Sequence, residues 1–470
     1  MAHYDLAIIG SGSGNSLITE FWDNKKVAII DAGIFGGTCL NVGCIPTKMF
    51  VYPAALAASV AEAKRLGVSM SFAGADWPAM RDRIFGRIDA ISEAGKNYRA
   101  NELENVTLYA EHVSFVSSHE LRTASGASIT AEKIVIAAGS RAVLPQAPGI
   151  NLPGVHTSDT IMRLERLPQR LVILGGGYIA SEFAAVFSAL GSEVTQVNRS
   201  SALMRGQDAD ISAAFTKAAT TRWGVELNAA LSSITREGEV LSIHLERDGQ
   251  SLILEADVVL VATGRTPNTD GLGVSELGFD MRADGSLVVD DYQRILADGA
   301  VVEGLFGLGD VANTQQLKHV ANREARVVIN NLENPESLRT MDRRAVPAAV
   351  FSNPQIAYVG ATEEQARAEH GDRVLSVVQP YGSTAYGWAM EDEEGIVKLL
   401  AHRDTGLLLG AHIMGHEASL LIQPLIQAMY SGMDVNTMAR GPFWIHPALS
   451  EVVENALLAL GMSPCANDPL

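Results

Sequence analysis

The sequence predicts an α/β protein built from two β-turn-α-β units and a C-terminal α+β domain. The first unit is expected to contain an apolar strand at 6–10, a glycine-rich turn, a helix and a second strand at 27–30. The same plan returns at 171–197, which suggests an internal duplication. Each unit is followed by an apolar strand that runs into a glycine, at 134–139 and 258–264. Units of about thirty residues in this order have the size of one nucleotide-binding half.

The sequence pattern changes at about residue 345. From there, apolar runs alternate with two helical stretches, 363–370 and 417–432. This region carries no glycine-rich nucleotide motif, so we expect an α+β domain. The predicted boundaries are 1–155 for the first part of one nucleotide-binding domain, 156–265 for a second such domain, 266–343 for the remainder of the first, and 344–470 for the C-terminal domain.

The composition indicates a soluble multidomain protein. The chain has 470 residues, 47% of them hydrophobic and 19% charged, and this length exceeds what one core serves. A formal net charge of −18 disfavours nucleic acid and anionic membranes as partners. Three cysteines are too few for a secreted disulfide framework, so we expect a reducing, cytoplasmic compartment. A strand near residue 4 leaves no room for a signal peptide, and no apolar run approaches bilayer length.

The first glycine-rich turn predicts a dinucleotide site. Gly10 and Gly12 stand where a tight turn and a close approach to a pyrophosphate require them. Gly14 precedes Asn15, which occupies the third motif position. Asp31 follows about twenty residues later, where a carboxylate accepts hydrogen bonds from ribose hydroxyls. We therefore expect a Rossmann-like domain here.

The second glycine-rich turn has the pattern G-x-G-x-x-A, formed by Gly175, Gly177 and Ala180. The residues after its next strand indicate which nucleotide binds. An NAD site carries an acid at this point, whereas this chain has Asn198, then Arg199, and Arg205 six positions further on. Arginines bind a 2′-phosphate through charge-assisted forks, so the pattern favours NADPH over NADH. The alternative is a pair of solvated surface arginines.

Two cysteines lie just after the first unit. Cys39 and Cys44 are five positions apart, and a long helix is expected to run from 45 toward 66. A helix N-terminus stabilises a thiolate, and Lys48 would lie one turn further on the same face. This arrangement predicts a redox pair that receives electrons from a bound cofactor. A structural cystine, or two unreactive buried thiols, is the alternative.

The segment 36–48, Gly-Gly-Thr-Cys-Leu-Asn-Val-Gly-Cys-Ile-Pro-Thr-Lys, closely resembles the redox motif of the flavoprotein disulfide reductases. This family includes lipoamide dehydrogenase, glutathione reductase and mercuric reductase. The resemblance runs along the full chain and implies two Rossmann-like domains, for FAD and NADPH, plus a C-terminal dimerisation domain. It implies FAD contacts at Gly10, Gly12, Gly14, Asp31, Gly37, Thr38, Lys48, Gly139, Ser158, Asp159 and Asp310. It implies NADPH contacts at Gly175, Gly177, Tyr178, Ala180, Asn198, Arg199, Arg205 and Gly264.

The resemblance also implies catalytic roles. Glu182 would pair with Lys48 at the reducing edge of the flavin, and Tyr178 would cover the flavin until nicotinamide arrives. Cys44 would be the thiolate in contact with the flavin, while Cys39 would attack the substrate disulfide. For Tyr178, a core aromatic is the alternative. No metal site is indicated.

Near the C-terminus, His446 and Glu451 match the family's acid–base pair. Histidine has an unperturbed pKa suited to exchanging protons with a thiol. A carboxylate one turn away can hold its ring in one orientation. In the family this pair reaches the cysteines of the other subunit, so the resemblance implies a homodimer with shared active sites.

Several local strings resemble one subgroup, the mycothione reductases, which reduce the disulfide of a sugar-inositol thiol. These strings lie at 12–16, 48–52, 386–392 and 444–447. The segment 17–23 lacks the arginines by which glutathione reductases hold glutathione carboxylates, which favours a neutral or sugar-like disulfide. Trp22 and Trp388 are candidate substrate contacts, with packing roles as the alternative.

Other functions fit less well. An NAD-linked dihydrolipoamide dehydrogenase would carry an acid where Asn198 stands. Mercuric reductase and large thioredoxin reductases would need a second redox group in the tail, where this chain has the single Cys465. A redox-silent FAD-binding scaffold, from a different class, is disfavoured because the chain retains the whole redox and acid–base set.

Overall fold

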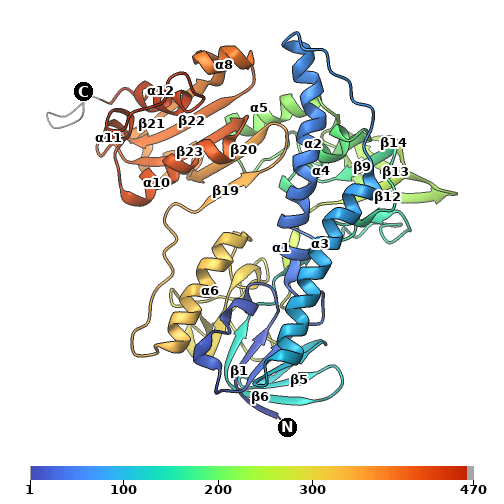
Figure 1. Cartoon of the computed structure of the whole chain (residues 1–470), viewed down its shortest axis with the longest axis vertical. Helices are drawn as coiled ribbons and strands as arrows, with labels where there is room; N and C mark the ends of the chain where they lie inside the picture. The colour runs from blue at the N-terminus through green and yellow to red at the C-terminus, as the bar shows by residue number, and fades with distance from the viewer. Residues whose placement is uncertain (1, 463–470) are drawn as a thin grey trace.

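The computed structural model describes residues 2–462, so Cys465 lies outside the described residues. Its first body is a mixed eight-stranded sheet (Figure 1) with the order β17-β18-β6-β1-β2-β3 and a hairpin, β4 and β5, beside β6. Both faces of this sheet are covered, which is why the apolar run of β1 is buried on alternate sides. The strands are β1 (Ala2–Ile9), β2 (Val27–Ile30), β3 (Val106–Tyr109), β4 (Val113–Ser117), β5 (Glu120–Thr123), β6 (Ser128–Ile136), β17 (Arg294–Ala297) and β18 (Ala300–Gly307).

The second body is a five-stranded parallel sheet with the order β11-β10-β9-β15-β8. In β9, Leu171 and Ile173 pack on α4, while Val172 and Leu174 pack on a three-stranded meander, as the two-residue period of a strand requires. The elements are β8 (Val155–His156), β9 (Arg170–Leu174), α4 (Tyr178–Ala189), β10 (Glu193–Val197), α5 (Ala209–Thr220), β11 (Gly224–Glu226), the meander β12 (Ala230–Glu237), β13 (Val240–Arg247) and β14 (Gln250–Ala256), and β15 (Val258–Val261).

The third body is a five-stranded antiparallel sheet with the order β19-β20-β23-β22-β21, covered by helices. The expected α+β architecture is confirmed. The strands are β19 (Pro347–Val350), β20 (Gln355–Gly360), β21 (Val374–Pro380), β22 (Ile396–His402) and β23 (Leu408–Gly415). The helices are α7 (Glu363–His370), α8 (Ala385–Met390), α9 (Ala418–Leu421), α10 (Gln423–Ser431), α11 (Val435–Arg440) and α12 (Glu451–Ala459).

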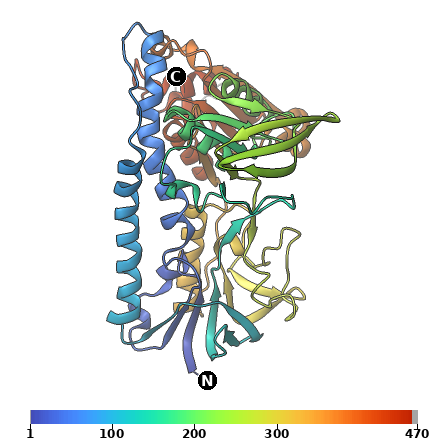
Figure 2. The same cartoon turned by 90° about the vertical axis from the view of Figure 1, so that its right-hand side faces the viewer.

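Two long helices, α2 (Cys44–Arg65) and α3 (Trp77–Asn97), run along one side of the molecule and link the first body to the second (Figure 2). They follow α1 (Gly37–Asn41). Trp77 stacks on Phe50 of α2 with ring centroids 4.7 Å apart and lies 5.2 Å from Phe187 of α4. This aromatic column fixes α2, and with it the cysteines, against the second body.

The segment Gly37–Arg65 is long and apolar enough to cross a membrane by length and composition alone. The expectation that no run approaches this length was therefore wrong. The cause is the alanine-rich, weakly charged sequence of α2, whose buried residues Phe50 and Ala54 serve contacts with protein.

The first unit departs from the expected β-turn-α-β plan. In place of one helix it has two 3-10 turns, η1 (Gly14–Leu17) and η2 (Glu20–Trp22). The β-branched pair Ile18 and Thr19 takes extended backbone between them, and Thr19 caps the second turn by accepting from the backbone N–H of Phe21. The helix expected at 417–432 is likewise split into α9 and α10, because Pro424 has no N–H to donate within a continuing helix.

Short elements connect the bodies. A two-stranded ribbon, β7 (Ser140–Ala142) with β16 (Arg265–Pro267), bridges the first and second sheets. The turn η5 (Gly309–Val311) leads from β18 toward α6 (Lys318–Glu333), which covers the first sheet. The remaining turns are η3 (Tyr98–Glu102), η4 (Ile161–Arg163), η6 (Gly371–Arg373) and η7 (Tyr381–Ser383).

Candidate active site

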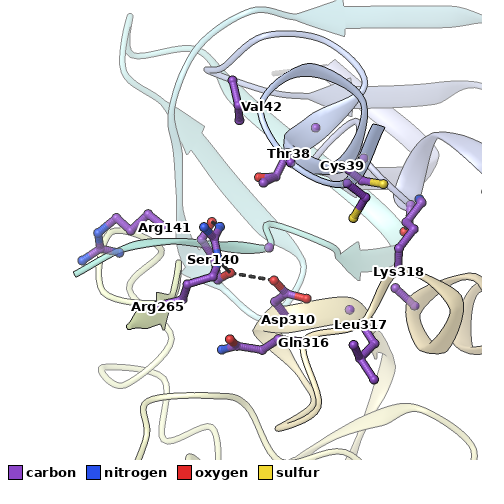
Figure 3. Close-up of a pocket in the computed structure, with 18 of the residues that line it drawn as sticks. Thr38, Cys39, Val42, Ser140, Arg141, Arg265, Asp310, Gln316, Leu317 and Lys318 are labelled. Carbon is purple, nitrogen blue, oxygen red and sulfur yellow. Dashed lines mark hydrogen bonds between the residues drawn. The ribbon is translucent and has the colours of Figure 1, made fainter. Parts of the chain in front are cut away.

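A cavity of about 1470 Å³ lies where the three bodies meet, and residues of the first glycine turn, α1, α2, α4 and α6 line it. Figure 3 shows part of its wall, with Cys39, Asp310 and Lys318. Both cysteines, Glu182 and Tyr178 are part of its wall. The residues expected at the FAD site that line it are Gly10, Gly12, Asp31, Gly37, Thr38, Lys48, Gly139, Ser158, Asp159 and Asp310. Gly14 does not line it; a Cβ there would lie 2.8 Å from Cγ2 of Ile8, so this glycine serves the packing of η1 on β1.

Glycine backbones form one wall of the cavity. Gly10 has φ of +105°, and a Cβ there would lie 2.3 Å from the carbonyl oxygen of Ala137. A Cβ on Gly37, with φ of +70°, would lie 2.7 Å from Cα of Gly12. The two turns therefore cross with bare backbone, and this leaves a surface that a flat or extended ligand can approach closely.

Asp31 holds the first turn together at the edge of this wall. Its Oδ2 accepts from the backbone N–H of Ser11 at 2.7 Å and from the Ser11 hydroxyl at 2.5 Å. Its Oδ1 accepts from the backbone N–H of Gly33 at 2.7 Å. The carboxylate is half-buried and lines the cavity, and its contact with a ribose stays a prediction.

Asp310 belongs to a polar chain that crosses from the first body to the β7–β16 ribbon. The Ser140 hydroxyl donates to Oδ2 of Asp310 at 2.6 Å, and Nε of Arg265 donates to that same hydroxyl at 2.8 Å (Figure 3). Asp310 is a residue of η5, whose N-cap position is Leu308. These hydrogen bonds hold the Asp310 carboxylate so that it faces the cavity.

The two cysteines lie on adjoining helices and are free thiols. Cys44 is the first residue of α2, which begins one residue before the expected start at 45, and Cys39 is on α1. The Cys39 S–H donates to Cys44, and this hydrogen bond, followed by the charge of Lys48, lowers the pKa of Cys44 to about 6. The same hydrogen bond and burial raise the pKa of Cys39. At neutral pH the pair therefore holds one thiolate, on Cys44.

Lys48 and Glu182 meet beside this thiolate. The Nζ of Lys48 lies 2.9 Å from Oε1 and 2.8 Å from Oε2 of Glu182, as expected from the sequence. Glu182 is 6% exposed, and its Oε1 also accepts from the backbone N–H of Phe351 at 2.8 Å. The pair thus brings α2, α4 and the third body together at one point of the cavity.

The second glycine turn has the backbone of a nucleotide-binding turn. Gly175 has φ of +136°, and a Cβ there would lie 2.2 Å from the carbonyl oxygen of Ala262. Ala180 is fully buried, while Gly177 and Gly264 have open space where a Cβ would stand. Tyr178 begins α4 and is 46% exposed at the cavity, so the alternative of a core aromatic is not supported.

The loop after β10 presents two cations to solvent. Asn198 turns inward, because its Nδ2 donates to the carbonyl oxygen of Ala202 at 2.7 Å. Arg199 and Arg205 are exposed, and neither side chain has a hydrogen-bond or ion-pair partner among residues 2–462. Two guanidinium groups of this loop are thus free to contact a ligand, whereas the Asn198 amide stabilises the loop itself.

His446 and Glu451 form the expected pair, with Nδ1 of His446 and Oε1 of Glu451 2.7 Å apart. The imidazole side chain is 71% exposed, whereas the Glu451 side chain is 17% exposed and begins α12. This pair does not line the cavity that contains the cysteines. Phe443 and Ile445, its neighbours, are 104% and 74% exposed. Within one chain, therefore, the structure does not bring the acid–base pair to the cysteines.

The two tryptophan candidates differ. Trp22 is 3% exposed in the core beneath the first sheet, which favours its alternative role in packing. Trp388 is 67% exposed, and its Nε1 donates to the carbonyl oxygen of Gly382 at 2.8 Å.

Lys318 is a site residue that the sequence reasoning missed. It opens α6, lines the cavity near Cys39, and its Nζ donates to the Ser13 hydroxyl at 2.8 Å (Figure 3). Its charge opposes the rise in the pKa of Cys39. The only local signal is a lysine that follows Asp310 in the sequence, and no pattern in the sequence connects it to Cys39.

Comparison with known proteins identifies this architecture. The family model for pyridine nucleotide-disulphide oxidoreductases matches residues 4–325, and the model for their dimerisation domain matches residues 346–457. The chain belongs to the pyridine nucleotide-disulphide oxidoreductases. Its third body is thus the dimerisation domain of this family.

Several members of the family align over nearly the whole chain. Mycothione reductase of Mycobacterium tuberculosis (strain H37Rv) is 50% identical over 98% of this chain and 100% of its own length. Glutathione reductase of Burkholderia cepacia is 31% identical over 95% of this chain and 97% of its own. The HOCl-induced flavoprotein disulfide reductase RclA of Escherichia coli superposes with a TM-score of 0.82 and 29% identity, covering 97% of this chain and 99% of that one.

In this pyridine nucleotide-disulphide oxidoreductase, Lys48→Met is expected to lower the free energy of unfolding by about 2 kcal/mol, because it leaves the buried Glu182 carboxylate without its cation. The side chain of Lys48 is 35% exposed, so solvent screening reduces the cost. Urea unfolding measures this change in the free energy of unfolding. Adding Glu182→Gln removes the buried charge and should restore most of the loss; equal stability of the single and double variants would contradict the ion-pair explanation.

Proposed function

We propose that this protein reduces mycothione to mycothiol with NADPH, through FAD and the Cys39–Cys44 pair. The observation that carries the proposal is the polarised pair itself, a Cys44 thiolate and a Cys39 thiol on one cavity wall beside Lys48 and Glu182. The full-length similarity to mycothione reductase supports the substrate.

The cavity wall fits FAD. The crossed backbones of Gly10, Gly12 and Gly37 would accept a pyrophosphate, Asp31 would hold the adenosine ribose, and the Asp310 carboxylate faces the same cavity. When bound, FAD accepts a hydride from a nicotinamide and delivers two electrons to a disulfide. Tyr178 and the Lys48–Glu182 pair would orient the approach of the nicotinamide.

The protein's own residues carry out the exchange with substrate. Starting from the pair of Cys39 thiol and Cys44 thiolate, Cys39 gives its proton to His446 of the partner subunit and attacks one sulfur of the substrate disulfide. This forms a mixed disulfide and releases one thiolate, which takes a proton from His446 of the partner subunit. The Cys44 thiolate then attacks the sulfur of Cys39, which releases the second product as a thiolate that takes a proton from solvent and leaves the Cys39–Cys44 disulfide. One substrate disulfide becomes two thiols as the enzyme dithiol becomes a disulfide, so the electrons balance.

The exposed Arg199 and Arg205 support NADPH as the electron source. Reversing both charges, Arg199→Glu with Arg205→Glu, is expected to raise KM for NADPH at least about 100-fold, because two charge-assisted contacts become repulsive. KM for NADH, which has no 2′-phosphate, should change little. Steady-state kinetics with each nucleotide measures the preference, and an unchanged NADPH preference in the double variant would eliminate these arginines as its cause.

The substrate is tested by NADPH oxidation with purified protein and a panel of three disulfides, those of mycothiol, glutathione and lipoamide. The acidic segment 20–23 and the absence of arginine there favour the uncharged mycothiol disulfide. The expected result is the highest kcat/KM for mycothione. Preference for glutathione disulfide would overturn the substrate and leave the reaction class intact.

The same proposal includes the assembly and its location. A homodimer that shares its active sites would bring His446 of one subunit to the cysteines of the other. The 443–447 segment, with exposed Phe443 and Ile445 beside His446, supports this arrangement because apolar side chains of this size favour burial in an interface. A dithiol that must be regenerated, in a chain with three cysteines, supports a cytoplasmic enzyme.

A further inference from the structure

A buried lysine joins the second body to the third. Lys398 lies on β22 with 2% of its side chain exposed. Its Nζ is 2.8 Å from Oδ1 of Asp208, 2.6 Å from Oδ2 of Asp210 and 2.7 Å from Oε2 of Glu363. The Asp208 side chain is 1% exposed. Buried charges are retained only when paired, so the position of the buried Asp208 carboxylate depends on this cation.

Asp208 lies at the end of the loop that follows β10 and carries Arg199 and Arg205, called the arginine loop below. It is the N-cap of α5, since its Oδ1 accepts from the backbone N–H of Asp210 at 3.1 Å. Its Oδ2 accepts from the backbone N–H of Glu363, in the third body, at 2.9 Å. Arg205 stands three residues before it. The loop that carries the two exposed arginines is therefore anchored at its exit by contacts from another domain.

The other contacts that hold the arginine loop come from within the second body. Its entrance follows β10, where Asn198 holds Ala202. In its middle, the backbone N–H of Met204 donates to the carbonyl oxygen of Gly176 at 2.7 Å, in the second glycine turn. The side chains of Arg199 and Arg205 have no partner of their own among the described residues, so the backbone alone sets their spacing and direction.

We propose that Lys398 is a positioning residue for NADPH specificity, which acts through Asp208 to hold Arg205 and Arg199 at the spacing that a 2′-phosphate requires. The inference rests on the proposed use of NADPH. Without the lysine, the aspartates would repel each other and Glu363, and the start of α5 would move. The 2′-phosphate contact would weaken, whereas contacts shared by NADPH and NADH, at the glycine turn, would remain.

The chain offers a matched control at the other end of the same helix. Arg222, just after α5, bridges to Glu394 of the third body through contacts of 3.1 and 2.5 Å. This pair also joins the second body to the third, but it lies at the opposite end of α5 from Asp208. Glu394→Gln therefore tests domain docking without altering the loop exit.

The experiment measures kcat and KM of the full-length holoenzyme for NADPH and for NADH with a saturating disulfide. For Lys398→Met we expect KM for NADPH to rise about tenfold, KM for NADH to change less than about twofold, and kcat at saturating NADPH to be retained. Glu394→Gln should leave both KM values unchanged. If Lys398→Met does not fold, Lys398→Gln keeps a polar partner for Asp208 but removes the positive charge, and the same selective rise is expected.

Equal rises in KM for both nucleotides, no rise, or the same change in Glu394→Gln would overturn the proposal. The wild-type preference is measured first. A wild-type enzyme without preference for NADPH refutes the proposed cofactor. A preference for NADPH that survives the loss of Lys398 refutes only the positioning role.

Discussion

Replacing His446 with glutamine is expected to lower kcat for disulfide reduction by roughly 10²–10⁴-fold, the range found for removing a positioned acid–base group. Glutamine keeps a polar side chain near Glu451 but cannot exchange a proton at neutral pH. Reduction of the enzyme by NADPH should proceed at its normal rate, because the pair serves the departing thiol and not the nicotinamide side. Single-turnover kinetics of each half-reaction makes this separation.

Mixed dimers test whether the pair acts on the other subunit. His446→Gln chains and Cys39→Ser chains are each inactive alone. Refolded together at equal amounts they form hybrids in which one of two sites combines an intact cysteine pair with an intact histidine. Half of the dimers are hybrids, so about a quarter of wild-type activity is expected. If the pair acted within its own chain, mixing would restore nothing.

The elements with a local signal were predictable from the sequence. Strands β2 and β10 and helix α7 lie where their apolar runs or end signals placed them, and α7 even has a capping box from Thr362 to Gln365. The secondary-structure predictions failed where contacts with other parts of the fold outweigh the local sequence pattern. The pair Ile18 and Thr19 interrupts the helix expected from the β-turn-α-β plan, and the Thr19 hydroxyl donates to Glu333, 314 residues away.

The sequence predicted the motifs that form the candidate site, but not the contacts between their side chains. Glycines, cysteines and Asp31 lie in the cavity because a motif fixes their local backbone. Other contacts that hold the site and its nucleotide loop are distant in sequence: Ser140 and Asp310 are 170 residues apart, and Asp208 and Lys398 are 190 apart. No residue pattern records such a pairing, so Lys318, the Ser140 hydroxyl and Lys398 had to be found in the structure.

The second large effect concerns the cysteine pair. Cys39→Ala is expected to abolish turnover, because no thiol remains to attack the substrate. It should also raise the pKa of Cys44 well above about 6, since the S–H donor is the largest cause of its lowering. A donor and a cation favour the charged form, so removing either raises the pKa. At pH 7 the Cys44 thiolate fraction should fall from about 90% to a minority.

Serine provides the matched comparison, because Cys39→Ser is equally unable to attack but its hydroxyl can still donate to Cys44. In a Cys465→Ser background each variant has one titrating thiol, which thiolate absorbance follows with pH. The midpoint should rise in the order Cys39→Ser, Cys39→Ala, then Cys39→Ala with Lys48→Met. Identical midpoints for serine and alanine would show that Lys48 and the start of α2, rather than the neighbouring thiol, set the charge of Cys44. In the enzyme with both cysteines, disulfide reduction should weaken as pH falls through about 6, where the resolving thiolate is protonated.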